Sequence, residues 1–275
     1  MSPQTTVIPD RSHPDLLAAD EPAPWRVVNP AGRRPLLLVC EHASSRVPRA
    51  LADLGLPADE RGRHIGVDIG AEALTLSLAE RLDAPAVLAA YSRLVVDLNR
   101  TLDDPTLIPP VSDLTEVPGN VGLTAADRQR RLDALYHPFH TAVTARIDAM
   151  RAAGAPPALV GVHSFTPLLR EAQRRGEVPR PWHVGILWNE DGRIALPLLD
   201  ALRAEGDLVV GDNQPYSGRG GRGHTAHIHG DAPGLPWVML EIRQDLIADA
   251  PGVAAWAERL ARLLPPILDG LAPPR

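Results

Sequence analysis

Polar residues that can do chemistry follow four separate apolar runs of the sequence. Two histidines, an acid and an asparagine–arginine pair stand where a buried strand would reach the end of a sheet. The run LLLVC leads to Glu41-His42, LVVDL to Asn99-Arg100, ALVGV to His163-Ser164, and WVML to Glu241 with Arg243 two residues later. Ligands of open α/β sheets bind outside the carboxyl ends of the strands. These residues are therefore predicted to gather at one edge of one sheet.

The types of these residues indicate a hydrolytic metal site. Imidazole and carboxylate groups are good ligands for zinc, and a catalytic zinc keeps one position open for water. The metal lowers the pKa of that water from 15.7 to about 7, which provides a nucleophile at neutral pH. A separate carboxylate can take the proton of the water and deliver it to a leaving nitrogen. An arginine offers a planar fork for a substrate carboxylate, so the set predicts hydrolysis of an amide in a molecule that carries a free carboxylate.

The composition of the 275-residue chain excludes several other classes of function. All 28 positive charges are arginine, which rules out Schiff-base lysine and P-loop chemistry. Cys40 is the only cysteine, so there is no internal disulfide or cysteine-rich zinc site, and it is expected to be buried. The net charge of -6 argues against nucleic-acid binding. The sequence has no HExxH or GxSxG motif, so zincin and α/β-hydrolase classes lack support. It also has no signal peptide and no apolar run of the ~18 residues that a membrane helix needs, so a soluble, cytoplasmic protein is expected.

The elements that must position these residues alternate along the chain. Apolar runs of strand length lie at Pro35–Cys40, Ala86–Ala90, Leu94–Leu98, Ala158–Val162, His183–Trp188, Leu208–Val210 and Trp237–Leu240. Helical patterns lie at Ile69–Leu82, Ala125–Ala152 with Thr124 as a plausible N-cap, Arg193–Glu205 and Val253–Leu271. This alternation predicts an α/β fold, a three-layer αβα sandwich with a mixed, mostly parallel sheet.

Two long segments and one terminus lack such patterns. Proline-rich residues 1–24 are expected to form an arm on the surface, and residues 25–275 a single domain. The segments Asn99–Gly122 and Asp212–Gly234 have no period, and loops of that length in a compact domain are usually functional. Arg219 and Arg222 could close the second loop over an acidic substrate if that loop is a lid, which the sequence leaves open.

With these residues in this order, the chain resembles the N-formylglutamate amidohydrolase family. The resemblance rests on CEHASSRVP, HIGVDIGAEAL, YSRLVVDLNR, IPPVSDLTEVPGN, GVHS and GLPWVMLEIRQDLI, which occur in that order between about residues 36 and 250. Members of this family are similar in fold to zinc carboxypeptidases. In those enzymes a metal histidine, an Asn-Arg pair, a second metal histidine and a catalytic glutamate follow one another, and the same order occurs in this chain.

The resemblance implies a role for each of these residues. His42 and His163 would bind zinc, Asn99 and Arg100 would hold the substrate carboxylate, and Glu241 would be the general base. The third ligand departs from the pattern, because carboxypeptidases place a glutamate three residues after the first histidine, where this chain has Ser45.

Two residues compete for the place of the third metal ligand. Asp68 is favoured, with an N-cap of the helix from Ile69 as its alternative role. Glu41 is the other candidate, but neighbours on a strand point to opposite faces, so Glu41 and His42 reach one ion with difficulty.

The remaining candidates concern the substrate. Arg93 is expected to contact an anion or to pair with a helix end, and Arg243 to bind substrate. His229 is expected to contact substrate or transition state, and His64, four residues before Asp68, to orient a ligand.

The function implied is that of a metal-dependent amidohydrolase. A water activated by zinc would remove the N-formyl group, or another small N-acyl group, from an acidic amino acid such as N-formyl-L-glutamate. Manganese, iron or cobalt could replace zinc. The alternatives are a carboxypeptidase-like peptidase or a hydrolase of other N-acyl amino acids or modified peptides, and a non-catalytic binding protein that keeps the fold. The expected partner is a small molecule, without nucleic acid or membrane, and the oligomeric state stays open.

Overall fold

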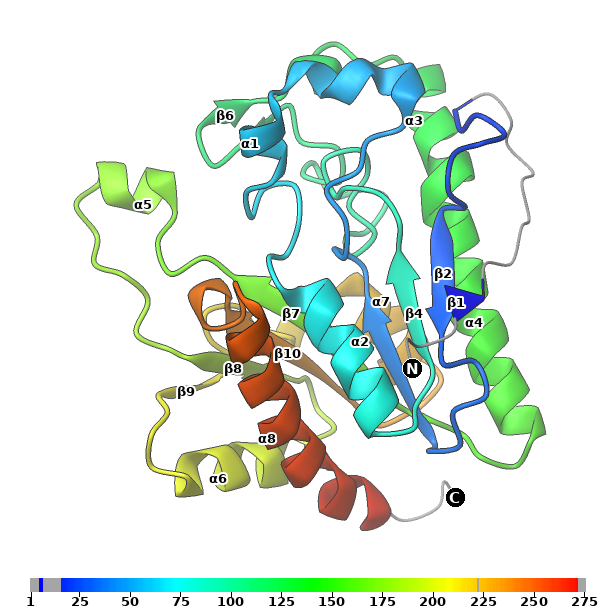
Figure 1. Cartoon of the computed structure of the whole chain (residues 1–275). Coiled ribbons are helices and arrows are strands. Elements are labelled where there is room, and N and C mark those ends of the chain that lie inside the picture. The colour runs from blue at the N-terminus through cyan, green and yellow to red at the C-terminus, as the bar shows by residue number, and fades with distance from the viewer. Residues whose placement is uncertain (1–4, 7–15, 222, 272–275) are drawn as a thin grey trace.

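The computed structural model describes residues 5–6, 16–221 and 223–271, and it is built on one eight-stranded sheet (Figure 1). Its spatial order is β1-β2-β4-β3-β7-β10-β8-β9. The central strands β4, β3, β7 and β10 run parallel, whereas the β1–β2, β2–β4 and β10–β8 pairs are antiparallel. The strands are β1 (Thr5–Thr6), β2 (Trp25–Val28), β3 (Leu36–Cys40), β4 (Ala86–Ala89), β7 (Ala158–Phe165), β8 (Val184–Leu187), β9 (Val210–Asp212) and β10 (Trp237–Arg243).

Helices cover both faces of this sheet, which confirms the predicted α/β sandwich with a mixed, mostly parallel sheet. The helices are α1 (Ala58–Arg61), α2 (Ala71–Arg81), α3 (Ala125–Arg131), α4 (His137–Ala152), α5 (Arg170–Arg174), α6 (Ala195–Ala204), α7 (His224–Ala226) and α8 (Ala250–Asp269). In Figure 1, α2 and α8 lie in front of the sheet, and α4 lies behind its β2–β4 side. None of the described helices has both the length and the apolar character needed to cross a membrane.

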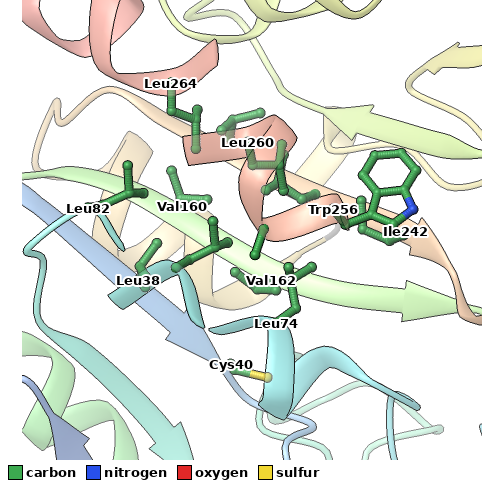
Figure 2. Close-up of a cluster of buried hydrophobic side chains, with 14 of the residues drawn as sticks. Leu38, Cys40, Leu74, Leu82, Val160, Val162, Ile242, Trp256, Leu260 and Leu264 are labelled. Atoms are coloured by element: carbon green, nitrogen blue, oxygen red, sulfur yellow. The ribbon is translucent and has the colours of Figure 1, made fainter. Parts of the chain in front are cut away.

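Side chains of the strands alternate between two cores. On β3, Leu36, Leu38 and Cys40 pack with α2, α6 and α8, while Leu37 and Val39 face the α4 side. Figure 2 shows the first core, where Cys40 lies beside Leu74 and Val162, so the expected burial of the cysteine is confirmed. Strands with apolar side chains on both faces are typical of parallel sheets covered by helices.

The long helix predicted at residues 125–152 is continuous but changes its winding. A π-helical turn at Leu132–Tyr136 joins α3 to α4, and Thr124 caps α3 with a capping box to Asp127. A second π-helical turn, His227–Asp231, follows α7 within the segment Asp212–Gly234, which was expected to be irregular. Single π-helical turns are frequent near functional sites.

One predicted strand is wrong. Residues 94–98 form turns, with Val95 N–H donating to Ser92 O and Asp97 N–H to Leu107 O instead of to a neighbouring strand. Leu94, Val95, Val96 and Leu98 are nevertheless buried, so the apolar run reported burial correctly and backbone conformation incorrectly. A short apolar run does not distinguish a strand from any other buried segment.

Other elements differ at the margins of the fold. The strand β2 was not predicted, and β7 and β10 each continue three residues beyond their predicted ends. The segment Asn99–Gly122 holds a small hairpin of β5 (Val111–Ser112) and β6 (Thr115–Glu116). In the region expected to be an arm, β1 pairs with β2 and Leu16 is buried. Residues 1–4 and 7–15 of that region, and Arg222, lie outside the described residues.

A buried polar network holds the irregular segment against α3. Arg131 is 2% exposed, and its guanidinium donates to Val95 O at 3.0 Å, Gly119 O at 2.8 Å and Asn120 Oδ1 at 2.6 Å. Asn120 in turn donates to Leu94 O and to Pro109 O, each at 2.9 Å. Burial lowers the pKa of Arg131 to about 10, so the side chain remains charged at pH 7. The Arg131 guanidinium therefore donates hydrogen bonds to backbone carbonyl groups that receive none from a neighbouring strand.

We expect Arg131→Ala to lower the free energy of unfolding by about 3 kcal/mol, because three buried acceptors lose a charged donor. Urea denaturation followed by circular dichroism measures this change. Arg130→Ala is the matched control, since Arg130 is exposed on the same helix and lies 3.9 Å from Asp127, and it should change stability by less than about 0.5 kcal/mol. Equal stability of the two variants would contradict the structural role of Arg131.

Candidate active site

Two histidines and an aspartate form a buried cluster at the carboxyl edge of the sheet. The Nδ1 atoms of His42 and His163 lie 3.2 Å and 2.9 Å from Asp68 Oδ2. One ligand atom from each of the three residues falls within 4.8 Å of the others, and all three side chains are at most 3% exposed. The cluster unites the two histidines singled out in the sequence with the favoured third residue, and it has the dimensions of a metal site.

Each member of the cluster is placed by the backbone beside it. His42 lies two residues after the end of β3, and His163 belongs to β7, the next strand in the sheet. Asp68 lies in the turn before α2, where its N–H donates to His42 O at 3.0 Å. Gly70 then turns the chain into α2 with a φ of +79°, and a Cβ there would lie 2.1 Å from Ile247 O. Only glycine fits that turn without strain.

The alternative role of Asp68 as a helix cap finds no support. The N-cap of α2 is Gly70, and no side chain caps that helix. Asp68 Oδ2 instead faces both histidines and accepts from Ser164 N–H at 3.3 Å.

Two further carboxylates lie behind the histidines. Asp97 Oδ1 is 2.8 Å from His42 Nε2, and Glu41 Oε2 is 3.2 Å from His163 Nε2. Each imidazole therefore presents Nδ1 to the cluster and Nε2 to a buried acid, through a hydrogen bond for His42 and an ion-pair contact for His163. Acids in such positions orient the imidazoles of metal-bound histidines. Asp97 was not among the site residues predicted from the sequence, and Glu41 was predicted as an alternative metal ligand rather than as a partner of His163.

The charges of this site shift the pKa of every member. Burial alone would raise the pKa of Glu41, but His163 and His42 outweigh burial and lower it to about 2. The pKa values of Asp68 and Asp97 also lie well below their usual range, because His42 and Arg93 outweigh the effect of burial. Burial lowers the pKa of both imidazoles, yet the neighbouring carboxylates raise both above the ordinary value. The site therefore attracts positive charge.

Glu241 stands one strand further along the same edge. Its backbone is in register with His163 across the β7–β10 pair, and its side chain is 8% exposed. Burial, together with Asp68, raises the pKa of Glu241 to about 7 despite the opposing charge of His163. Its buried Oε2 accepts no hydrogen bond from any residue in the described part of the chain. A carboxylate of this kind can exchange a proton with a water or a substrate near neutral pH.

These groups open onto a cavity of about 240 Å³. Asn99, Arg100 and Arg93 line it as predicted, and so does His64. Its other lining residues are His42, Asp68, His163, Ser164, Phe165, Thr166, Leu187, Tyr216, Ser217, Gly223, Met239 and Glu241. The cavity therefore brings together the candidate metal cluster, the candidate base Glu241 and Arg100, which was predicted to bind substrate.

The two arginines of the cavity differ in their partners. Arg93 donates to Asp97 Oδ2 through Nη2 at 2.7 Å and Nε at 3.1 Å, and to Asp68 Oδ1 through Nη1 at 3.2 Å. Arg93 therefore holds two acids of the site in place. Arg100 lies 3.9 Å from Asp97 and 3.8 Å from Asp104, beyond hydrogen-bond distance, and its side chain is 38% exposed.

Two residues expected at the substrate lie elsewhere. His229 is buried beneath the Asn99–Arg100 segment, where its Nε2 is 3.0 Å from His140 Nδ1, and it does not line the cavity. Arg243, at the end of β10, pairs with Asp245 and donates to Trp182 O, so it also lies outside the cavity lining. The predicted direct contacts of these two side chains with substrate are therefore not supported by the structure.

Comparison with known proteins identifies the family of this chain. The family model of N-formylglutamate amidohydrolase matches residues 34–248. An N-formylglutamate deformylase of Pseudomonas putida is 27% identical over 248 residues, which cover 84% of this chain and 88% of that protein.

Two solved structures extend the comparison. A gene product of Agrobacterium tumefaciens has a TM-score of 0.86 and 38% identity over 92% of this chain and 98% of its own. The N-formylglutamate amidohydrolase of Ralstonia eutropha JMP134 has a TM-score of 0.66 and 25% identity over 90% of this chain and 98% of its own. The chain belongs to the N-formylglutamate amidohydrolase family, and it is a hydrolase that acts on an amide bond.

Proposed function

We propose that this chain is a zinc-dependent amidohydrolase that removes the formyl group from N-formyl-L-glutamate. The observation that carries the proposal is the buried cluster of His42, Asp68 and His163, with Glu241 beside it in one cavity. The substrate follows from the family and from the name of the Pseudomonas putida relative.

The chemistry of the donor set supports a divalent cation. Two imidazole nitrogens and one carboxylate oxygen are a typical ligand set of catalytic zinc, which needs three protein ligands and an open position. Four carboxylates, those of Glu41, Asp68, Asp97 and Glu241, are buried around this point, and Arg93 bonds to two of them. Buried charges are stable when they are paired or coordinate a metal, so the excess of negative charge favours an ion in the cluster.

The residues of the cavity divide the catalytic work between them. A zinc ion held by the cluster would acidify a water and polarise the carbonyl oxygen of the amide. Glu241 is positioned to take a proton from the attacking water and to deliver it to the leaving nitrogen. A pKa of about 7 suits a group that must both accept and release a proton. The water oxygen adds to the formyl carbon to form the new C–O bond, and the C–N bond then breaks as Glu241 protonates the nitrogen, which yields formate and glutamate.

Arg100 and Asn99 are proposed to bind the substrate carboxylate. Arg100 makes no side-chain hydrogen bond within the described part of the chain, so its planar fork is available for a bidentate contact. A cavity of about 240 Å³ is smaller than the roughly 300–1,000 Å³ of sites for drug-sized ligands. Its size therefore favours a small N-acyl amino acid over a peptide.

The first test is metal content together with activity. We expect elemental analysis of the purified wild type to give about one zinc per chain, and the protein to release formate from N-formylglutamate. His42→Ala should lose both, because it removes one of three ligands. His137→Ala is the control, since His137 is half-exposed on α4 and lies near Asp133 instead of the metal cluster. This variant should retain both zinc and activity. A wild type that takes up no divalent metal and releases no formate would contradict the proposal.

The second test separates the base from the metal. We expect Glu241→Gln to keep the zinc content of the wild type and to lower kcat by about 10²- to 10⁴-fold, the usual contribution of a general base. Steady-state kinetics with formate detection, alongside elemental analysis, measures both quantities. A kcat within threefold of the wild type would remove Glu241 from the reaction.

The third test concerns the acids behind the histidines. We expect Asp97→Asn and Glu41→Gln each to weaken zinc binding by about 10- to 100-fold, because each acid orients one imidazole and raises its basicity. Competition with a zinc chelator of known affinity measures the change. Asp103→Asn, at an exposed acid of the same loop as Asp97, is the control. Zinc affinities equal to that of the control would show that the two acids do not support the ligands.

A further inference from the structure

Three consecutive residues, Leu98, Asn99 and Arg100, are held by hydrogen bonds from two helical segments, and the last two of them line the cavity. Leu98 O lies 3.0 Å from His140 Nε2, and Arg100 O accepts from Tyr136 Oη–H at 2.9 Å. Between them, Asn99 Oδ1 accepts from Thr225 N–H at 3.1 Å, at the first turn of α7. The segment that carries Asn99 and Arg100 is therefore fixed at its backbone on both sides and at one side chain.

These bonds take the place of a neighbouring strand at residues 98–100, as the bonds of Asn120 and Arg131 do at Leu94 and Val95. Residues 94–100 are not in a strand, so no ladder of neighbouring strands determines where Asn99 and Arg100 point. A backbone segment without such a ladder keeps more conformational freedom unless side chains restrict it. The bond from Tyr136 acts at Arg100 itself, and the bond from His140 acts at Leu98, the residue before Asn99.

The direction of the His140 bond follows from its partners. Leu98 O can only accept, so His140 Nε2 carries the hydrogen and donates it. Burial, with His229 and His224 nearby, lowers the pKa of His140 to about 3, so the ring is neutral at pH 7 and its Nδ1 is an acceptor. His229 Nε2, 3.0 Å away, then donates to that Nδ1. His229 thus holds the imidazole of His140 in the orientation in which it donates to Leu98 O.

The helix geometry brings the two donors to the same place. Tyr136 ends the π-helical turn before α4, and His140 lies four residues later, so both side chains leave the helix on one face. Their ring centroids are 4.5 Å apart, and both residues are less than 9% exposed. Neither side chain lines the cavity, so neither contacts a bound substrate.

We propose that Tyr136 and His140, with His229 behind His140, are positioning residues that orient Asn99 and Arg100 toward the substrate carboxylate. The inference rests on the proposed role of Arg100 in binding that carboxylate. It assigns the two side chains to substrate affinity and not to bond cleavage, because His42, Asp68, His163 and Glu241 lie on other elements. Asp97, which contacts His42 from the same segment, is held separately by Arg93.

The first experiment compares KM with kcat for N-formylglutamate. Tyr136→Phe and His140→Met each remove one donor, and we expect KM to rise about fivefold to tenfold while kcat stays within twofold and zinc content is unchanged. His140→Gln, whose amide can donate to Leu98 O, should restore most of the lost affinity. His137→Gln, at the half-exposed neighbour on α4, is the control and should leave KM unchanged. A purely structural role would lower stability and active fraction without this rise in KM.

The second experiment is a double-mutant cycle with Arg100→Ala. That variant alone should raise KM by about 100-fold, because a charged bidentate contact is lost. In its background Tyr136→Phe should have little further effect, since the side chain that Tyr136 orients is gone. Independent effects that multiply would overturn the inference.

The outcomes separate the inference from the proposed function. If Arg100→Ala raises KM while Tyr136→Phe and His140→Met leave it unchanged, the positioning role alone is wrong. If Arg100→Ala leaves KM unchanged, the carboxylate role of Arg100 fails, and the positioning role fails with it.

Discussion

Burial of negative charge at the carboxyl edge of the sheet is the constraint on which the site depends. Glu41, Asp68, Asp97 and Glu241 are all at most 8% exposed and lie around two imidazoles. An ionised carboxylate taken out of water costs several kcal/mol unless it is paired. Arg93 pairs with two of the four acids, and the imidazoles contact three of them, so the cluster is stable only as a charge-balanced unit. The ion proposed for the cluster would add positive charge that Arg93 alone does not supply to the four acids.

The strand order explains why this unit could be foreseen from the sequence in outline. Because β3, β7 and β10 are parallel neighbours, the residues that end their apolar runs meet at one edge. His42, His163 and Glu241 were found by that rule alone. The alternation of side chains along β3 also predicted that His42 and Glu41 point to opposite faces. In the structure Glu41 contacts His163 on the α4 side. This contact continues the register of the two strands, in which Val39 pairs with Gly161.

The features that could not be foreseen depend on contacts between distant segments. Asp97 stands inside the apolar run LVVDL, and its role appears only when the chain turns at residues 94–98 and brings the carboxylate to His42. His229 has the residue type of a catalytic group, but the helical turns after α7 direct it toward His140. Arg243 follows Glu241 with the two-residue period of a strand, yet at the end of β10 it pairs with Asp245. Local pattern reports neither a turn in a buried segment nor the partner of a charged side chain.

The two halves of the site are built in different ways. His42, His163 and Glu241 lie in or just after central strands of a close-packed sheet, where a change of register would disturb every neighbouring residue, and Asp68 lies in the turn before α2. Asn99 and Arg100 rest on an irregular segment held by single hydrogen bonds from Tyr136, His140 and Thr225. Each of those bonds can be lost or replaced without moving the sheet. The orientation of Asn99 and Arg100, the pair proposed to bind the substrate carboxylate, can therefore change while His42, Asp68, His163 and Glu241 stay in place.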